Sequence, residues 1–205
     1  AALSDHQGTV VFRHEHVSED PFLTFAATLY DAHMQYYVQA LANQGSPYAY
    51  PTLGSTIAVD AISYAQARGF PKRNAGEDFH FLNKLNKLQP ITWLQQPTIK
   101  VQARRSTRVV FGTGPALEKI ITLLQDDPSG IGYLSYDHQC FELLGKGLDY
   151  LQLCSQHPKD STGSPSESAD HARVVQIFQR LGLDKVINDK FYQQPSPEQR
   201  LRLLT

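Results

Sequence analysis

The sequence predicts an α/β protein followed by a helical C-terminal region. A β-branched run at residues 9–12 (TVVF) is typical of a strand, and the apolar residues between Phe22 and Leu41 recur at helical spacing. After Gly112-Thr113-Gly114-Pro115, every strong apolar pattern has the helical period. Strands are therefore expected only in the first part of the chain.

A long helix is expected after the first strand. Ser18 offers an N-cap and Pro21 a proline in the first helical turn, both of which favour a helix start. The apolar spacing then continues to about Asn43, and Gly45 ends the pattern.

Three elements follow in the middle of the chain. Residues 52–59 favour a strand, and residues 61–68 favour a short helix that Gly69-Phe70-Pro71 ends. A loop then leads to Glu77 and Asp78, which begin a helix with an apolar stripe from Phe81 to Leu88.

Residues 91–94 and 98–101 favour two more strands, and residues 104–111 a basic, extended segment. The change of pattern at Gly114 divides the chain into an α/β part, residues 1–114, and a helical extension, residues 115–205.

The extension is expected to hold four helices. Three cover roughly residues 115–124, 135–154 and 174–181, and a capping box at residues 196–199 begins a short fourth helix. Residues 157–169, rich in Ser, Pro and charge, favour a loop.

The composition narrows the functional classes. The chain of 205 residues has 19 Lys and Arg against 20 Asp and Glu, a formal charge of −1, which gives no basis for binding nucleic acid or an anionic membrane. Its 41% hydrophobic content predicts a globular core. No apolar run approaches the roughly 20 residues that span a bilayer, and no signal peptide is visible, so we expect a cytoplasmic protein.

Gly76-Glu77-Asp78 is the sharpest chemical feature of the sequence. It places two carboxylates where a loop enters a helix, next to a glycine that lets a substrate approach. A carboxylate held there suits a general base that accepts a proton from an attacking hydroxyl. The alternative is that these carboxylates only cap the helix.

Arg104 and Arg108 form the second feature. A spacing of four puts both side chains on one face of either a strand or a helix, so the two guanidinium groups converge. These two guanidinium groups, in a basic segment that also contains Arg105, could clamp a diphosphate, and the alternative is a solvated basic edge. Gly112-Thr113-Gly114 lacks the lysine and the spacing of a P-loop, so no ATP site is expected there.

The histidines and cysteines do not predict a metal site. His14 and His16 share one face of a strand, but a third ligand is needed, and the candidates are His33 and His80. Cys140 and Cys154 form neither a disulfide framework nor a zinc pattern.

The order of these motifs resembles the second half of a family 2 glycosyltransferase of the GT-A type. The segments that carry the resemblance are Leu53-Gly54-Ser55-Thr56-Ile57-Ala58-Val59, Tyr64 to Gly69-Phe70, Gly76-Glu77-Asp78-Phe79, Leu82 to Leu88 and Ile91–Leu94. Ala103-Arg104-Arg105-Ser106-Thr107-Arg108-Val109 with Phe111-Gly112-Thr113-Gly114 is similar to a bacterial subgroup of that family. The resemblance covers about half of the chain well and implies a partial GT-A-like mixed sheet with flanking helices.

The resemblance implies that the complete enzyme transfers a sugar from a nucleotide sugar to an acceptor, with inversion. Asp78 matches the catalytic base of the family, and Glu77 matches its acidic neighbour near the acceptor. Substrate-binding positions are implied for Gly54, Ser55, Gly76, Arg104 and Arg108, of which the arginines would compensate the charge of the departing diphosphate.

One departure from the family is large. Such enzymes begin with a nucleotide-binding half that ends in an Asp-x-Asp motif, which holds the diphosphate through a divalent metal, and this sequence has no such half. We therefore expect Mg²⁺ or Mn²⁺ in the complete enzyme and no metal in this chain alone. The missing half implies a fragment of a longer transferase or a split or degenerate relative. The sequence also opens without Met, which is compatible with a tag remnant or an excised piece of a longer chain.

The expected ligands are a nucleotide sugar and a glycan or small-molecule acceptor. A half-sheet would expose a strand edge, which we expect the C-terminal helices, a second copy of the chain or a partner to cover. The alternative function is that of a non-catalytic module, a truncated relative that binds a glycan or a partner protein.

Overall fold

The computed structural model describes residues 8–106, 112–156, 169–187, 193–194 and 196–199. The chain forms two compact units. The first comprises residues 1–40 and 48–136, and the second comprises residues 41–47 and 137–205. Within the described residues, no helix is both long and apolar enough to cross a membrane.

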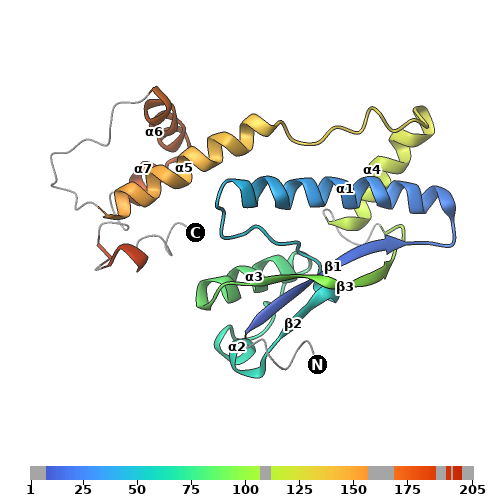
Figure 1. The fold of residues 1–205 in the computed structure, drawn as a ribbon, viewed down its shortest axis with the longest axis horizontal. Coiled ribbons are helices and arrows are strands. Elements are labelled where there is room, and N and C mark those ends of the chain that lie inside the picture. Colours follow the sequence, from blue (N-terminus) through green and yellow to red (C-terminus); the bar gives the residue numbers. More distant parts are fainter. Residues whose placement is uncertain (1–7, 107–111, 157–168, 188–192, 195, 200–205) are drawn as a thin grey trace. The chain divides into compact units, whose positions relative to one another are not determined.

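The first unit is built on a mixed three-stranded sheet, which confirms the predicted α/β class (Figure 1). The central strand β1 (Thr9–Val17) pairs antiparallel with β2 (Ile57–Val59) and parallel with β3 (Thr92–Gln102). β1 extends five residues beyond the predicted run of residues 9–12 because its polar second half also pairs with β3.

β3 is one irregular strand where the sequence predicts two. Phe12 pairs with Leu94 and His14 with Ile99, so four residues of β3 face a single residue of β1 at this point. Pro97 lies in that stretch and has no N–H to donate to a neighbouring strand, which accounts for the interruption. The position is tolerated because β3 is an edge strand of the sheet.

The helices of the first unit are α1 (Pro21–Asn43), α2 (Ala61–Gln66), α3 (Glu77–Leu88) and α4 (Thr113–Asp126), with a short 3₁₀ turn η1 at Gly54–Thr56. The alternation of β1 points Val11 toward α3, where it packs with the buried Phe81, Leu82 and Leu85. The opposite side of β1 faces α1.

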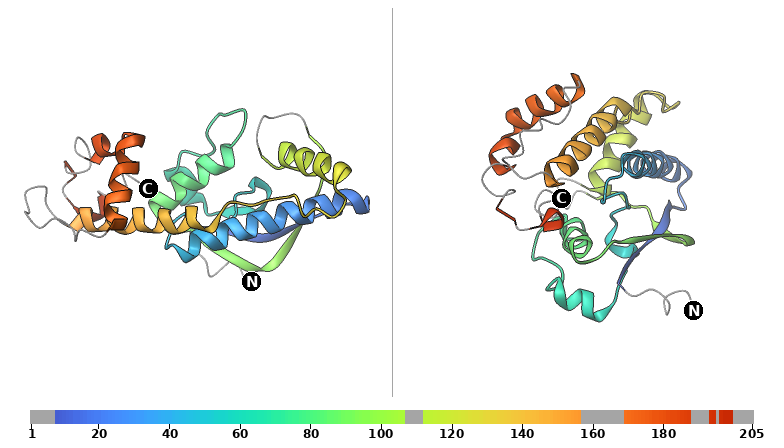
Figure 2. Two further views of the ribbon diagram at one scale, coloured as in Figure 1. Left: turned by 90° about the horizontal axis from the view of Figure 1, so that it is seen from above. Right: turned by 60° about the vertical axis from the view of Figure 1, so that its left-hand side comes forward.

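α4 lies beside α1, as both views in Figure 2 show. Ala26 and Ala27 of α1 allow close approach of the apolar face of α4, and the cluster between them contains Ala103, Leu117, Ile120, Ile121 and Leu124. α4 therefore belongs to the first compact unit, and the units divide after Tyr136 where the sequence predicts a boundary after Gly114.

The second unit is helical in its described part. It contains α5 (His138–Gln156), α6 (Ala169–Leu181) and α7 (Leu183–Val186), and Gly182 between the last two has a φ of 70°. Cys154 and Ile187 are buried together against Tyr150, Leu151 and Phe178. Cys140 is exposed and Cys154 is buried, and neither forms a disulfide. Of the predicted loop at 157–169, residues 157–168 lie outside the described residues.

Candidate functional site

The carboxyl ends of β1 and β3 lie at the same edge of the sheet, where the Ala103 N–H donates to the Val17 carbonyl at 2.8 Å. In open α/β sheets, ligands bind outside the carboxyl ends of parallel strands. Arg104 directly follows β3 and is exposed, and α4 begins at Thr113 close to the same edge. The carboxyl ends of β1 and β3 are therefore a candidate location for a ligand-binding site.

Asp78 and Gly54 lie next to each other. Gly76, with a φ of 69°, precedes α3, and Glu77 and Asp78 form its first turn. The Asp78 Oδ2 accepts the N–H of Gly54 at 3.0 Å, and its Oδ1 accepts the N–H of Phe79 at 2.8 Å. Glu77 and Asp78 are half-buried, whereas Gly54 and Ser55 are exposed on η1. Two separate segments of the predicted site thus meet at one carboxylate.

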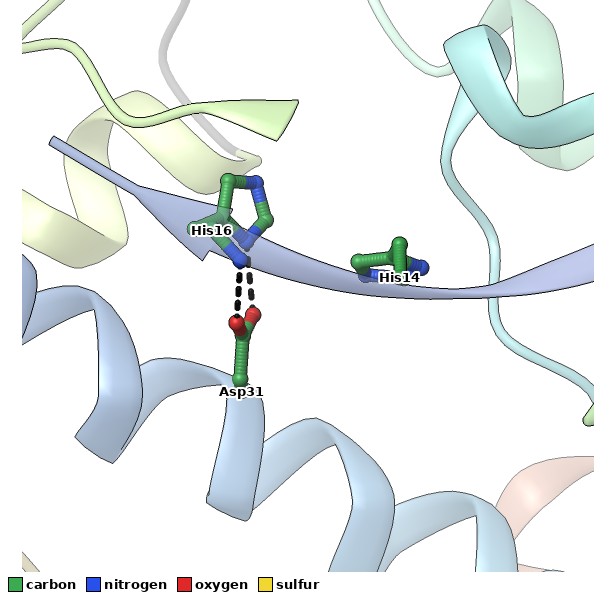
Figure 3. A group of neighbouring side chains, drawn as sticks. All are labelled: His14, His16 and Asp31. Atoms are coloured by element: carbon green, nitrogen blue, oxygen red, sulfur yellow. Dashed lines mark hydrogen bonds and ion pairs between the residues drawn. The ribbon is translucent and has the colours of Figure 1, made fainter. Parts of the chain in front are cut away.

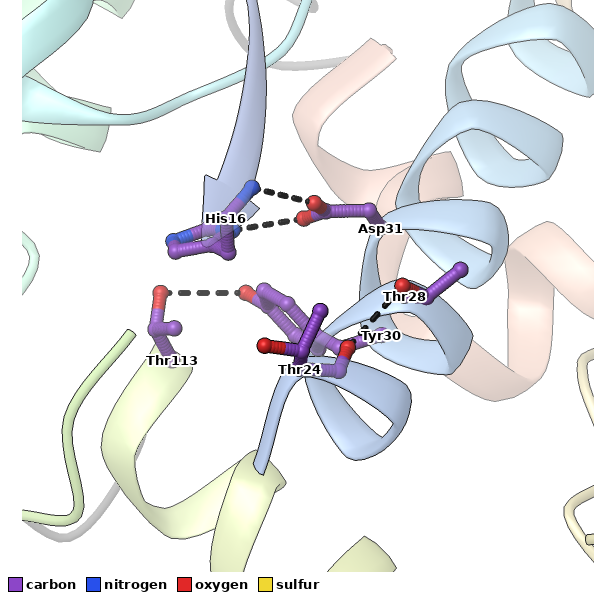
Figure 4. Close-up of polar contacts among 6 residues, drawn as sticks. All are labelled: His16, Thr24, Thr28, Tyr30, Asp31 and Thr113. Atoms are coloured by element: carbon purple, nitrogen blue, oxygen red, sulfur yellow. Dashed lines mark hydrogen bonds and ion pairs between the residues drawn. The ribbon is translucent and has the colours of Figure 1, made fainter. Parts of the chain in front are cut away.

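Tyr30 contacts the start of α4 near this edge of the sheet. The Thr113 hydroxyl donates to the Tyr30 hydroxyl at 3.4 Å, across 83 residues of sequence (Figure 4). Burial raises the pKa of Tyr30, the Thr113 hydrogen bond lowers it, and the carboxylates of Asp31 and Asp78 raise it further. The sequence did not predict the contact between Thr113 and Tyr30.

His16 and Asp31 form a buried pair beside Tyr30. The Asp31 Oδ1 lies 2.6 Å from the His16 Nδ1, and the Asp31 Oδ2 accepts the His16 backbone N–H at 2.7 Å. His16 is 5% exposed and Asp31 8%. The Tyr30 ring lies with its centroid 5.9 Å from that of His16, so three side chains of β1 and α1 hold one another in place.

His14 lies two residues before His16 on the same side of β1 (Figure 3). The two ring centroids are 5.5 Å apart and nearly perpendicular. Among the described residues, the Nδ1 of His14 is enclosed and has no hydrogen-bond partner. Burial lowers the pKa of His14, and the His16 ring lowers it further. Asp31 and the Phe12 carbonyl act in the opposite direction and raise this pKa.

The structure places Asp31 beside the histidine pair, where the sequence suggested His33 or His80. His33 bonds with its Nδ1 to the Ser135 hydroxyl at 2.8 Å and packs on Tyr133 and Tyr136. His80 lies on α3 against the ring of Phe79. A sequence signal for Asp31 exists, because it occupies the helical stripe that contains the buried Ala27 and Val38.

The arginines have separate surroundings. Arg105 forms a bidentate pair with Glu118 of α4, at 2.8 and 2.7 Å. Arg104 is exposed, and Arg108 lies outside the described residues. The predicted convergence of Arg104 and Arg108 therefore stays a prediction.

In the part of the chain that the structure describes, one group of side chains could hold a metal ion, namely His14, His16 and Asp31. Two of its three ligands are nitrogens, whereas Mg²⁺ prefers oxygen ligands. The group does not fit the Mg²⁺ that the family resemblance implies for a nucleotide diphosphate.

Comparison with family models, curated proteins and solved structures finds no match to this chain. Its function is therefore inferred from the residues and their geometry.

Proposed function

We propose that the first unit carries the acceptor side of an inverting glycosyltransferase, with Asp78 as the general base. In this reaction the oxygen of an acceptor hydroxyl attacks the anomeric carbon of a nucleotide sugar. The hydroxyl proton passes to a carboxylate oxygen of Asp78, and the nucleoside diphosphate leaves with the electrons of the broken bond. The half-sheet of β1, β2 and β3 would be part of a GT-A-like sheet.

The observation that carries the proposal is the fixed carboxylate of Asp78. The Gly54 N–H holds Oδ2, and the Phe79 N–H holds Oδ1. A carboxylate oxygen has two lone pairs, so each still has capacity to accept a proton. A base held in a set direction shortens the search for the reactive geometry.

The surroundings of Asp78 support the same reaction. Gly54, which lies beside the carboxylate, and its neighbour Ser55 are both exposed and would be accessible to an acceptor. The exposed Arg104, at the carboxyl end of β3, is suited to the negative charge of a diphosphate leaving group.

A second candidate is a glycan-binding module without catalysis. A cluster of aromatic side chains on α1 and the segment before α5 favours it: the Tyr136 ring lies 5.5 Å from His33 and 5.9 Å from Tyr37. Tyr136 is 58% exposed, and the Tyr36 hydroxyl fixes its backbone by donating to its carbonyl at 3.0 Å. Exposed, positioned rings can stack on the apolar faces of sugars.

The test uses the product of the full reading frame that contains these 205 residues. It is supplied with labelled nucleotide sugars and a panel of acceptors, and the labelled product and its anomeric configuration are recorded. Transfer with inversion, lost in Asp78→Asn, supports the proposal. The variant keeps an amide oxygen for the Gly54 N–H, so its loss of activity reports the missing base.

The two candidates separate in one experiment. Binding of a glycan without any transfer, lost in Tyr136→Ser and kept in Asp78→Asn, would favour the binding module and overturn the assignment of Asp78.

A further inference from the structure

We propose that His14, His16 and Asp31 form a binding site for a divalent transition-metal ion, for which Zn²⁺ is the probe. This inference is independent of the proposed transfer reaction. One ligand atom of each residue lies within 4.8 Å of the corresponding atoms of the other two. A Zn²⁺ ion with ligands at about 2.0–2.2 Å would fit among them after small side-chain rotations.

The two elements that supply the ligands face each other. His14 and His16 alternate with Arg13 and Glu15 along β1, so both rings lie on the side that α1 covers. Asp31 reaches them from the middle of α1. A spacing of two residues on a strand and a carboxylate from the opposing helix is thus enough to build a three-ligand site.

A bound metal ion would account for the surroundings of the His14 Nδ1. The His16–Asp31 pair satisfies itself, but the enclosed His14 Nδ1 has no partner among the described residues. An unpaired buried polar atom typically costs about 1–3 kcal/mol. A metal ion would give this nitrogen the partner that it lacks.

Asp31 is already oriented as a ligand. Its Oδ2 accepts the backbone N–H of His16 at 2.7 Å, which directs Oδ1 toward the His16 ring. Hydrogen bonds to ligating carboxylates have this effect in known metal sites. Binding would lengthen the contact between Oδ1 and the His16 Nδ1, as the ion takes the place of the proton between them.

The ligand set selects the class of metal. Two imidazole nitrogens and one carboxylate oxygen suit Zn²⁺ and its first-row neighbours, whereas Mg²⁺ takes oxygen ligands. Three protein ligands also leave a coordination position for water. A small cavity adjoins both His14 and Asp31, and Met34, Gln35, Val38 and Trp93 help to line it.

The experiment titrates the 205-residue chain, after treatment with a chelator, with Zn²⁺ by calorimetry and with Co²⁺ by absorption spectroscopy. We expect one equivalent to bind and d–d bands to appear. His14→Ala and Asp31→Asn should each weaken Zn²⁺ binding more than about 100-fold, because loss of an outer partner alone costs roughly 10–100-fold.

The matched control is His138→Ala. His138 also lies beside an aspartate, Asp137, but its side chain is 72% exposed and outside the cluster. This variant should bind Zn²⁺ like the wild type, and Mg²⁺ should not compete. Circular dichroism checks the fold of each variant. Should His14→Ala fail to fold, Asp31→Asn provides the test, because Asn keeps an acceptor for the His16 N–H.

No stoichiometric binding by the wild type would overturn the site. The site is equally contradicted if Asp31→Asn binds Zn²⁺ as tightly as the wild type, or if only His138→Ala loses binding.

Discussion

The backbone N–H of Gly54 donates to the Oδ2 of Asp78 at 3.0 Å, joining two segments that lie 24 residues apart. Through this bond, the 3₁₀ turn before β2 and the first turn of α3 hold a common carboxylate. Asp78 thus has a structural role besides the chemical role that we propose for it.

The structural role predicts different stabilities for two substitutions of Asp78. Asp78→Ala removes the acceptor of the Gly54 and Phe79 N–H groups and should lower the free energy of unfolding by about 1 kcal/mol. Asp78→Asn keeps an acceptor oxygen and should cost less. Urea denaturation of both variants checks this, and an unchanged free energy of unfolding in Asp78→Ala would show that these hydrogen bonds contribute nothing.

The buried pair on β1 and α1 predicts a second effect on stability. Asp31→Ala leaves the buried His16 ring and its backbone N–H without an acceptor. We expect the free energy of unfolding to fall by about 1–3 kcal/mol, measured with a chelator present to exclude metal binding. Asp31→Asn should lose less, because its amide oxygen can still accept the N–H. An unchanged Asp31→Ala variant would contradict the described pairing.

The packing of α4 on α1 can be tested at Leu117. This side chain is fully buried in the cluster that joins the two helices. Leu117→Ala should cost about 2–5 kcal/mol, because the deletion leaves a cavity. Leu134→Ala is the control: Leu134 is 81% exposed, and its loss should stay within about 0.5 kcal/mol. Similar losses for the two variants would place α4 outside the core.

Asp60 is the N-cap of α2, and its hydrogen bonds predict a pH effect. Hydrogen bonds from the Ser63 N–H and hydroxyl lower the pKa of Asp60 below its ordinary value of 3.8. A lowered pKa stabilises the folded state above pH 3.8, and that contribution is lost as the pH falls through the folded pKa. Ser63→Ala should move the Asp60 pKa back toward 3.8 in an NMR titration. An unmoved value would rule out the serine hydroxyl as a cause.

Much of the local structure could be predicted from the sequence. The strand at residue 9, the helix to Asn43 and the start of α3 at Glu77 all agree with the structure, because caps, prolines and apolar spacing act over a few residues. The face of α1 is less well predicted. Of the apolar pattern, Ala26 and Leu41 are buried, whereas Phe22, Phe25 and Tyr36 are exposed.

The tertiary part of the site could not be predicted in this way. The Thr113–Tyr30 contact spans 83 residues, and the His16–Asp31 pair spans 15. Such contacts depend on how helices pack on the sheet, which no local pattern specifies. A single acid within the apolar stripe of α1 was the available signal for Asp31, since a buried carboxylate needs a partner.

The most direct test of Asp78 as the general base is the turnover number of Asp78→Asn in sugar transfer, measured on the product of the full reading frame. Asp60→Asn, which alters another carboxylate at a helix start, is the matched control. We predict a loss of roughly 10²–10⁴-fold for Asp78→Asn, at nearly unchanged stability, and wild-type turnover for the control. Wild-type turnover in Asp78→Asn would contradict the role of Asp78 as the general base.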